Sequence, residues 1–413
     1  MSLIKPFRGL RPVPEHATDV AAPPYDVLNS AEARDRAAGK PWSFLHISKP
    51  EIDLPEGTDP YAAEVYAKGA ENLQAQIDAG ILMRDEAPCY YVYRLRMGDH
   101  IQTGLVFTGS VADYDTNRIR KHEYTRPAKE DDRVRQITAL NAQTGPVLLA
   151  YRANAEVKNI VASVTATEAT YDLVADGGVA HTLWVIADEE KIAQLTDLFN
   201  AMEALYIADG HHRSASGSRV AKAKDDELGT QAEDNSWDHF LCVAFPHDET
   251  QILDYNRVIK DLNGLNKEEL LAKIEAAFTV AAVSGQAKPA SAKQFGMYLE
   301  GQWYTLTINA DLVPADDPVG RLDISLLQNN LIAPLLGVED PRTDNRIDFV
   351  GGIRGLGELE RRVDSGEMQI AFALFPTSMD ALIAVADANE VMPPKSTWFE
   401  PKLADGLVSH VLD

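Results

Sequence analysis

The feature that most constrains the fold is the alternation of short apolar segments with amphipathic segments in the middle of the chain. Residues 181–186 and 205–208 are typical of buried strands, whereas residues 188–202 and 214–224 are typical of helices. Strands that alternate with helices in this way favour a mixed α/β or α+β fold. No internal repeat or extended low-complexity segment interrupts the pattern.

Local signals extend this prediction to the rest of the chain. Residues 89–111 predict a β-hairpin, since apolar residues alternate on both sides of a Gly-Asp turn. Asn29 with Glu32, and Asn266 with Glu269, have the spacing of capping boxes that begin helices. Further predicted elements are a helix opened by Pro60, helices over 132–143 and 323–336, and an exposed acidic loop over 225–236.

The length of 413 residues allows two or three domains at about 150 residues each. Composition changes near residues 155 and 262. We therefore expect an N-terminal α/β region over 1–155 with the hairpin and a basic segment, a central region over 156–262, and a C-terminal α/β region over 263–413.

The charge balance excludes several classes of partner. With 63 acidic and 39 basic residues, the formal net charge is −24, which repels nucleic acids and anionic membranes. The two cysteines, Cys89 and Cys242, are too few for a disulfide framework or a cysteine-built zinc site. The first residues lack a signal-peptide pattern, and no apolar run approaches the roughly 20 residues that cross a bilayer. We expect a cytoplasmic protein.

The most informative polar segment follows the apolar residues 205–208. Asp209 and Gly210 permit a tight turn into the helix that follows, whose free N–H groups and positive dipole end attract anions. Arg213 offers a forked donor for phosphate oxygens, and His211 and His212 can donate hydrogen bonds, ligate a metal or accept a proton. In the alternative interpretation, Asp209 caps the helix and the histidines only satisfy buried backbone groups.

A second candidate is the densest basic stretch of this acidic chain, which surrounds Glu123. We expect it to contact phosphate or substrate, with Glu123 as a general base for a hydroxyl nucleophile. The alternative is a solvated surface that pairs with the acidic residues 130–132. The basic residues of this stretch are Arg118, Arg120, Lys121, His122 and Arg126.

A third candidate lies near the end of the chain, where two prolines fix the loop that carries Lys395, Ser396 and Thr397. These residues are predicted phosphate or substrate contacts, although a packed structural turn is the alternative. A Walker motif is excluded, because Pro394 stands where that motif needs glycine. The sequence contains no His-Glu-x-x-His, Gly-x-Ser-x-Gly or dinucleotide-binding glycine motif.

Taken together, these segments resemble the DUF1015 family of uncharacterised bacterial and archaeal proteins. The strings that carry the resemblance include Arg11-Pro12, residues 22–27, 122–125, 209–213, 255–257 and 392–402. The Asp-Gly-His-His-Arg string is also similar to the signature of free-serine kinases with a ParB/sulfiredoxin-like fold. This resemblance implies a ParB-like nucleotide-binding core and a nucleotide phosphate site at Asp209, Gly210, His211, His212 and Arg213.

The leading functional hypothesis is a small-molecule phosphotransferase that acts on free serine or a similar hydroxylated metabolite. ATP or ADP with Mg²⁺ would bind at residues 209–213, His211 or His212 would stabilise the transferring group, and Glu123 would deprotonate the substrate. A non-catalytic nucleotide or metabolite sensor is the first alternative. A metal-dependent hydrolase that uses His211 and His212 is the second.

Overall fold

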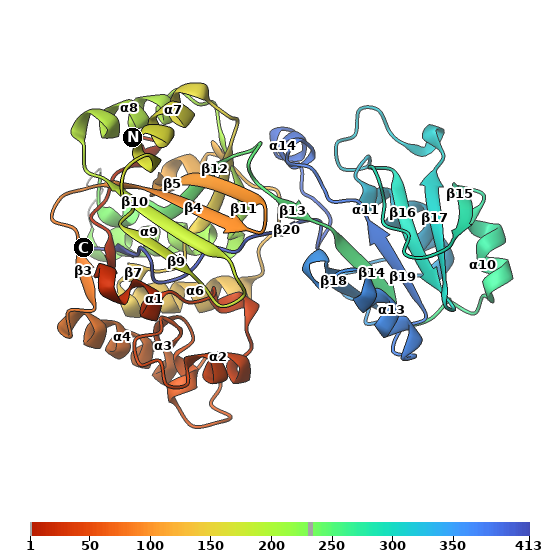
Figure 1. The fold of residues 1–413 in the computed structure, drawn as a ribbon, viewed down its shortest axis with the longest axis horizontal. Helices are drawn as coiled ribbons and strands as arrows, with labels where there is room; N and C mark the ends of the chain where they lie inside the picture. Colours follow the sequence, from red (N-terminus) through yellow and green to blue (C-terminus); the bar gives the residue numbers. More distant parts are fainter. Residues whose placement is uncertain (1, 230–233) are drawn as a thin grey trace. The chain divides into compact units, whose positions relative to one another are not determined.

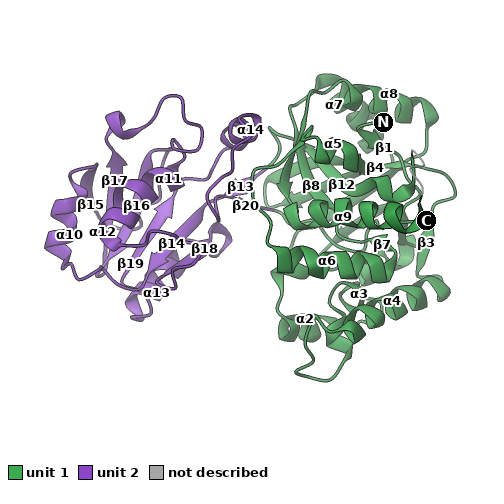
Figure 2. Cartoon of the chain, turned by 180° about the vertical axis from the view of Figure 1, so that it is seen from behind, with its two compact units in different colours: residues 1–250, 401–413 green, residues 251–400 purple. Residues whose placement is uncertain are grey.

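The computed structural model describes residues 2–229 and 234–413, which form two compact units. Unit 1 comprises residues 1–250 and 401–413, and unit 2 comprises residues 251–400 (Figure 2). The chain therefore leaves unit 1 after Thr250 and returns to it at Pro401. The fold is mixed α/β, with a large sheet and helices in unit 1 and a second sheet in unit 2 (Figure 1).

Unit 1 is built on a nine-stranded sheet, in the order β6-β11-β8-β12-β5-β4-β10-β9 with β1 beside β5. Two neighbouring pairs, β6 with β11 and β8 with β12, are parallel, and the other pairs are antiparallel. The strands are β1 (Ile4–Lys5), β4 (Tyr90–Met97), β5 (His100–Ser110), β6 (Ile119–Arg120), β8 (Val147–Tyr151), β9 (Tyr171–Val174), β10 (Ala180–Ile186), β11 (Leu205–Asp209) and β12 (His239–Pro246).

The core of unit 1 lies on this sheet. Strands β8 and β12 are buried along their whole length, as expected for near-continuous apolar runs in the centre of a sheet. Phe199 of α8 packs against the rings of Phe107 and Tyr151, at centroid distances of 5.5 and 5.1 Å. Helix α9 crosses the face of the sheet that Figure 2 presents, and α6 packs beside α9.

The helices of unit 1 surround the sheet, and a smaller apolar cluster joins the N-terminal ones. They are α1 (Ala17–Val20), α2 (Ser30–Ala37), α3 (Leu45–Ser48), α4 (Ala63–Asp78), α5 (Val111–Asp115), α6 (Pro127–Leu140), α7 (Ala155–Thr165), α8 (Glu189–Asn200) and α9 (His211–Leu228). Two short strand pairs complete the unit, β2 (Leu10–Pro12) with β3 (Leu82–Arg84) and β7 (Ala142–Gln143) with β21 (His410–Val411).

Unit 2 contains an antiparallel six-stranded sheet in the order β15-β17-β16-β19-β14-β18 and a short pair, β13 (Ile252–Leu253) with β20 (Trp398–Phe399). The sheet strands are β14 (Tyr255–Ile259), β15 (Phe278–Val283), β16 (Gln294–Leu299), β17 (Gln302–Ile308), β18 (Ile347–Gly351) and β19 (Ile370–Leu374). The helices are α10 (Lys267–Ile274), α11 (Asp323–Leu327), α12 (Ala333–Leu336), α13 (Leu356–Asp364) and α14 (Met379–Asp387).

Several predicted elements are confirmed. Both capping boxes form, with Asn29 and Asn266 each accepting a hydrogen bond from the backbone of the glutamate three residues later. The hairpin over 89–111 and the strands on either side of α8 are present. The helix over 323–336 is also present, with a π-helical segment at Gln328–Ile332.

Other element boundaries differ from the prediction. The helix expected to open at Pro60 begins at Ala63, because the Asp59 side chain accepts from the Tyr61 backbone and holds these residues in a turn. The helix predicted over 132–143 begins earlier, with Pro127 in its first turn, and ends at Leu140. The loop expected over 225–236 is helical as far as Leu228, and residues 230–233 lie outside the described chain.

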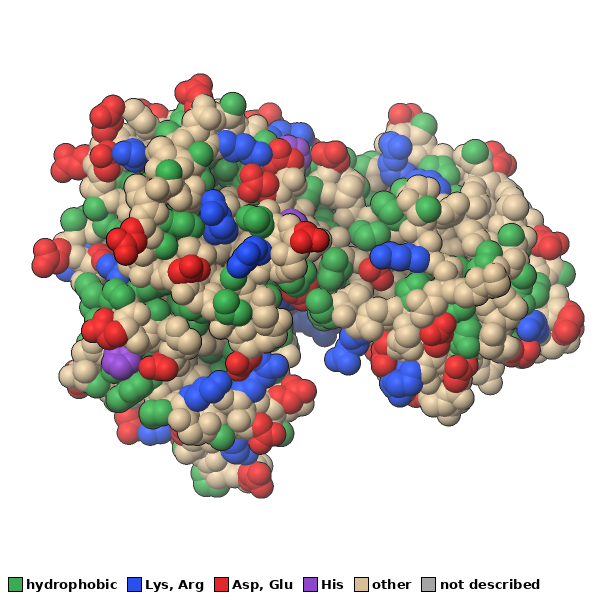
Figure 3. All heavy atoms as spheres, viewed as in Figure 1, with side chains coloured by type: hydrophobic (Ala, Val, Ile, Leu, Met, Phe, Trp, Pro, Cys, Tyr) green, Lys and Arg blue, Asp and Glu red, His purple; other side chains and the backbone are tan. Residues whose placement is uncertain are grey.

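The units also differ from the three predicted regions. The boundary expected near residue 155 falls inside unit 1, since β8 before it and β11 after it pair in one sheet. Within the described ranges, no helix is long and apolar enough to cross a membrane. On the face drawn in Figure 3, lysines and arginines are scattered among acidic side chains.

Candidate functional site

The candidate site is built at one edge of the unit 1 sheet, where three chain segments meet. Strand β11 pairs with β6 in parallel, so the residues that follow the two strands emerge at the same edge. Strand β8 runs antiparallel to β11, so the residues before β8 lie at this edge as well. The topology therefore brings together residues 121–126, 209–213 and 145–146, which are far apart in the sequence.

The turn between β11 and α9 has the conformation that its sequence predicts. Gly210 is the N-cap residue of α9. Its φ of 102° lies in a backbone region in which residues other than glycine are strained. No side chain caps the helix, so the alternative in which Asp209 is the cap is wrong. The first N–H groups of this 18-residue helix have no intrahelical acceptor, and Gly210 offers them no side-chain cap.

Asp209 sits between two basic side chains. Its carboxylate lies 3.5 Å from the Arg213 guanidinium and 3.3 Å from Lys402 Nζ. Burial raises the pKa of Asp209, but the charges of Lys402 and Arg213 outweigh it and hold the pKa well below its usual value. Arg213 also donates to the carbonyl oxygen of Pro146, before β8. This network carries one net positive charge.

His212 is half-buried, and its Nε2 atom accepts a hydrogen bond of 3.1 Å from the backbone N–H of Arg126. An accepting Nε2 places the proton of the neutral ring on Nδ1. Burial lowers the pKa of His212, and the charges of Arg126 and Lys129 lower it further, whereas Glu130 opposes them. His212 is therefore a neutral hydrogen-bond donor at neutral pH.

His122 and His211 form a buried ring pair. The exposed fraction of His122 is 2% and that of His211 is 5%, and the ring centroids are 4.5 Å apart in an edge-to-face arrangement. Burial lowers the pKa of His122 to about 4, although the Ile207 backbone and Asp209 oppose the change. Burial, with the nearby His122, also lowers the pKa of His211 well below its usual value. Both rings are therefore neutral at pH 7.

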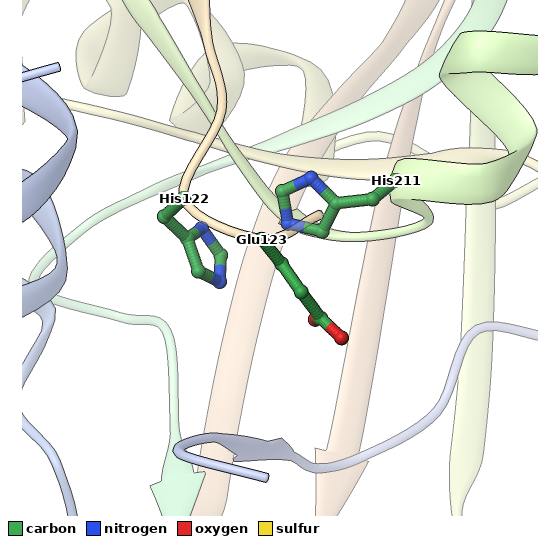
Figure 4. A group of neighbouring side chains, drawn as sticks. All are labelled: His122, Glu123 and His211. Atoms are coloured by element: carbon green, nitrogen blue, oxygen red, sulfur yellow. The ribbon is translucent and has the colours of Figure 1, made fainter. Parts of the chain in front are cut away.

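Glu123 lies next to this ring pair and is exposed. Figure 4 shows the two rings facing each other across the start of the Glu123 side chain. A nitrogen of each ring and a carboxylate oxygen of Glu123 all lie within 4.8 Å of one another. The predicted base Glu123 and the predicted site residue His211 are thus close together.

A small cavity of about 30 Å³ opens beside Arg213, on the side of α6. That volume has room for one or two water molecules. Arg133 and Asp405 also line it, and Arg133 lies 3.8 Å from the centre of the Tyr25 ring. Burial raises the pKa of Asp405 to about 7, although Arg213 and Arg133 lower it.

The predicted basic stretch divides into structural and site residues. Arg120 pairs with Glu203 at 2.8 Å, and Lys121 Nζ lies 3.8 Å from the centre of the Tyr114 ring. His122 and the backbone of Arg126 instead face the start of α9. In the alternative interpretation, the basic stretch pairs with the acidic residues 130–132. Those residues pair with basic residues outside the stretch, because Glu130 and Asp131 pair with Arg219 and Asp132 pairs with Arg133.

The third predicted segment lies in unit 2. Lys395 has φ of 58°, Ser396 Oγ donates to the Pro393 carbonyl at 2.6 Å, and Thr377 donates to the Ser396 carbonyl at 2.9 Å. These hydrogen bonds hold the backbone of the loop. Contacts of Lys395, Ser396 and Thr397 with phosphate or substrate stay a prediction.

Sequence reasoning did not assign a role to Lys402, Asp405, Arg133 or Tyr25. The resemblance included residues 22–27 and 392–402, which contain Tyr25 and Lys402, but assigned no chemistry to either. Asp405 carried no local signal. It reaches the site because its backbone pairs with that of Ala22, at 2.9 and 3.1 Å.

Comparison with known protein families decides the relationship. The model of the family described as "Protein of unknown function (DUF1015)" matches residues 4–325. The chain belongs to the DUF1015 family. No curated protein sequence matches this DUF1015 chain significantly.

Three solved structures give distant likenesses. One is a free serine kinase in complex with AMP, with 11% identity and a TM-score of 0.34 over 74% of this chain and 92% of that chain. Another is a conserved hypothetical protein from Pyrococcus furiosus, with 13% identity and a TM-score of 0.33 over 74% of this chain and 94% of that chain. The third is C-terminally truncated SbnI from Staphylococcus aureus, with 13% identity and a TM-score of 0.37 over 73% of this chain and 85% of that chain. At these values the likeness is no evidence of activity.

Proposed function

We propose that this DUF1015 protein is a phosphotransferase that binds nucleotide phosphates at the start of α9. The observation that carries the proposal is the uncapped N-terminus of α9, flanked by Arg213 and by the neutral donor His212. Backbone N–H groups and a helix dipole at one point attract an anion, and a guanidinium adds geometric selectivity for phosphate oxygens.

The ion pairs that Asp209 makes with Arg213 and Lys402 are longer than is usual. Charge-assisted hydrogen bonds are normally about 2.7–2.9 Å. Asp209 instead lies 3.5 Å from Arg213 and 3.3 Å from Lys402. A phosphate can share both cations with Asp209, and Mg²⁺ would neutralise the remaining charge of ATP or ADP.

Glu123 supplies the proton acceptor. In the proposed reaction the hydroxyl oxygen of a small metabolite such as serine bonds to the terminal phosphorus, and the bond from that phosphorus to the bridging oxygen breaks. The hydroxyl proton passes to the Glu123 carboxylate, and the nucleotide leaves with one phosphate fewer. Exposure of Glu123 keeps this carboxylate accessible to a substrate.

The direct test is to incubate the full chain with Mg²⁺, free serine and either ATP or ADP, and to detect phosphoserine by mass spectrometry. Arg213→Lys should lower nucleotide affinity by about 10-fold or more, since lysine lacks the paired N–H donors of the guanidinium group. Arg219→Lys, on the exposed side of the same helix, is the matched control and should leave it unchanged. Thermal unfolding of each variant checks that it is folded.

Glu123→Gln separates an enzyme from a nucleotide or metabolite sensor. An enzyme with this base should lose about 10²-fold or more of its turnover while keeping its nucleotide affinity. A sensor has no turnover to lose but shows the same loss of affinity in Arg213→Lys. The absence of both product and nucleotide binding in the unmodified chain would overturn the proposal.

A further inference from the structure

We propose that His122, His211 and Glu123 form a binding site for one divalent transition-metal ion of the Zn²⁺ class. The proposal goes beyond the phosphotransferase function and does not depend on it. It starts from two nitrogen atoms. Within the described part of the chain, neither Nδ1 of His122 nor Nε2 of His211 has a hydrogen-bond partner, and both atoms are buried.

Such a pair is unusual, because buried polar atoms nearly always have a partner, and an exception calls for a missing ion, a water or a functional role. The exposed fraction is 2% for His122 and 5% for His211. They come from different segments, one after β6 and one at the start of α9, and they meet because β6 and β11 are parallel neighbours. A shared ligand would satisfy both atoms.

The third donor completes a ligand set known for metals. The carboxylate of Glu123 and one nitrogen of each ring lie within 4.8 Å of one another. In a tetrahedral site with bonds of about 2.0–2.1 Å, the ligand atoms lie about 3.3 Å apart. Metal binding would therefore draw the three ligand atoms closer by at most about 1.5 Å. Two imidazoles and one carboxylate suit Zn²⁺, and a fourth position stays open.

The geometry selects which histidine would join His211. His122 Nδ1 and His211 Nε2 are the unpartnered buried atoms of the ring pair. His212, by contrast, uses Nε2 for the Arg126 N–H. The structure therefore pairs His211 with His122, and not with His212 as the hydrolase hypothesis expected.

This site is distinct in kind from the Mg²⁺ that accompanies a nucleotide. Mg²⁺ binds oxygen ligands in octahedral geometry, whereas two imidazoles favour a later transition metal. A Glu123 carboxylate that holds a metal cannot at the same time accept a substrate proton. Metal binding and the proposed base function therefore exclude each other at any one moment.

The experiment is a Co²⁺ titration of the metal-free full chain, without nucleotide, followed by visible absorption and then by displacement with Zn²⁺. We expect one Co²⁺ per chain with a strong tetrahedral band. His122→Ala, His211→Ala and Glu123→Gln should each weaken binding by at least about 10-fold. His212→Asn is the matched control, because it removes the neighbouring imidazole and should keep the Co²⁺ affinity.

Thermal unfolding of the metal-free variants shows whether each one folds. X-ray absorption of the Zn²⁺-loaded unmodified chain gives a second readout that needs no substitution. Two imidazole ligands with oxygen in the remaining shell are expected. A Co²⁺ affinity unchanged by His122→Ala and His211→Ala, or a zinc shell without imidazole, would overturn the proposal. Phosphoserine formation and nucleotide binding are separate readouts, so failure here leaves the proposed function standing.

Discussion

Replacement of Asp405 by Asn should reveal a buried carboxyl group that destabilises the fold at neutral pH. Asp405 has an exposed fraction of 2% and lines the cavity that also holds Arg133 and Arg213. Burial raises its pKa from 3.8 to about 7, with Asp26 adding to the effect, while Arg213 and Arg133 oppose it. Asparagine has nearly the shape of the protonated carboxyl group but never ionises.

The sign of the effect follows from proton linkage. Because the pKa of Asp405 is higher in the folded state, the folded chain binds more protons than the unfolded chain between pH 3.8 and about 7. The contribution of Asp405 to stability is therefore lost as pH rises through this window. The difference between 3.8 and about 7 corresponds to about 4 kcal/mol in the free energy of unfolding.

The assay is urea unfolding of the unmodified chain and of Asp405→Asn at a series of pH values. From pH 5 to pH 8 the variant should gain about 3 kcal/mol relative to the unmodified chain, at about 1.4 kcal/mol per pH unit up to the folded pKa. The comparison at pH 5, where the folded carboxyl group is protonated, serves as the internal control. A free-energy difference that stays constant over this range would refute the reasoning.

Two further predictions concern the turn and a buried histidine. Gly210→Ala should destabilise the chain by about 1–2 kcal/mol and weaken nucleotide binding, because φ is 102° and the added Cβ would lie 3.1 Å from Arg213 Nε. Gly229→Ala, at the other end of α9, has φ of 61° and no described atom within 4 Å of the added Cβ; it should show the strain in urea unfolding but unchanged nucleotide affinity in calorimetry. Burial lowers the pKa of His181 to about 4, so its contribution to stability is lost as pH falls from about 6.5 towards 4. His181→Gln should reduce this loss of unfolding free energy by about 3 kcal/mol. Acid unfolding followed by circular dichroism measures the change, and an acid transition at the same pH in both chains would contradict the prediction.

Local sequence patterns were sufficient for much of the fold. The strand at β11, the turn at Gly210 and the helix α9 each follow from neighbouring residues, as do the capping boxes at Asn29 and Asn266. The predicted boundary is wrong where a side chain stabilises a competing turn, as Asp59 does before α4. These cases depend on a balance between local hydrogen bonds that a pattern of apolar residues does not contain.

The candidate site could be predicted only in parts, because its assembly depends on strand pairing. The residues after 120 and those after 208 were predicted as two separate candidate sites, but their proximity follows from the parallel register of Leu205 with Ile119. Nothing near Asp405 in the sequence indicates that it reaches Arg133 and Arg213. Such long-range pairing has no periodic signal in a single sequence, so the cavity and the two-histidine cluster emerged only from the structure.

Part of the candidate site comes from the last residues of the chain, which return to unit 1 after unit 2. Unit 1 is interrupted after Thr250 by all of unit 2, and it resumes at Pro401. The resumed segment contributes Lys402 to Asp209 and Asp405 to the cavity, and its strand β21 pairs with β7. Without this segment, Asp209 would have only Arg213 as a cationic neighbour among these groups. The low pKa of Asp209 therefore depends in part on Lys402, a residue at the far end of the chain. The main core cluster of unit 1 consists of residues before 250, but the complete site also includes Lys402 and Asp405, which follow unit 2 in the sequence.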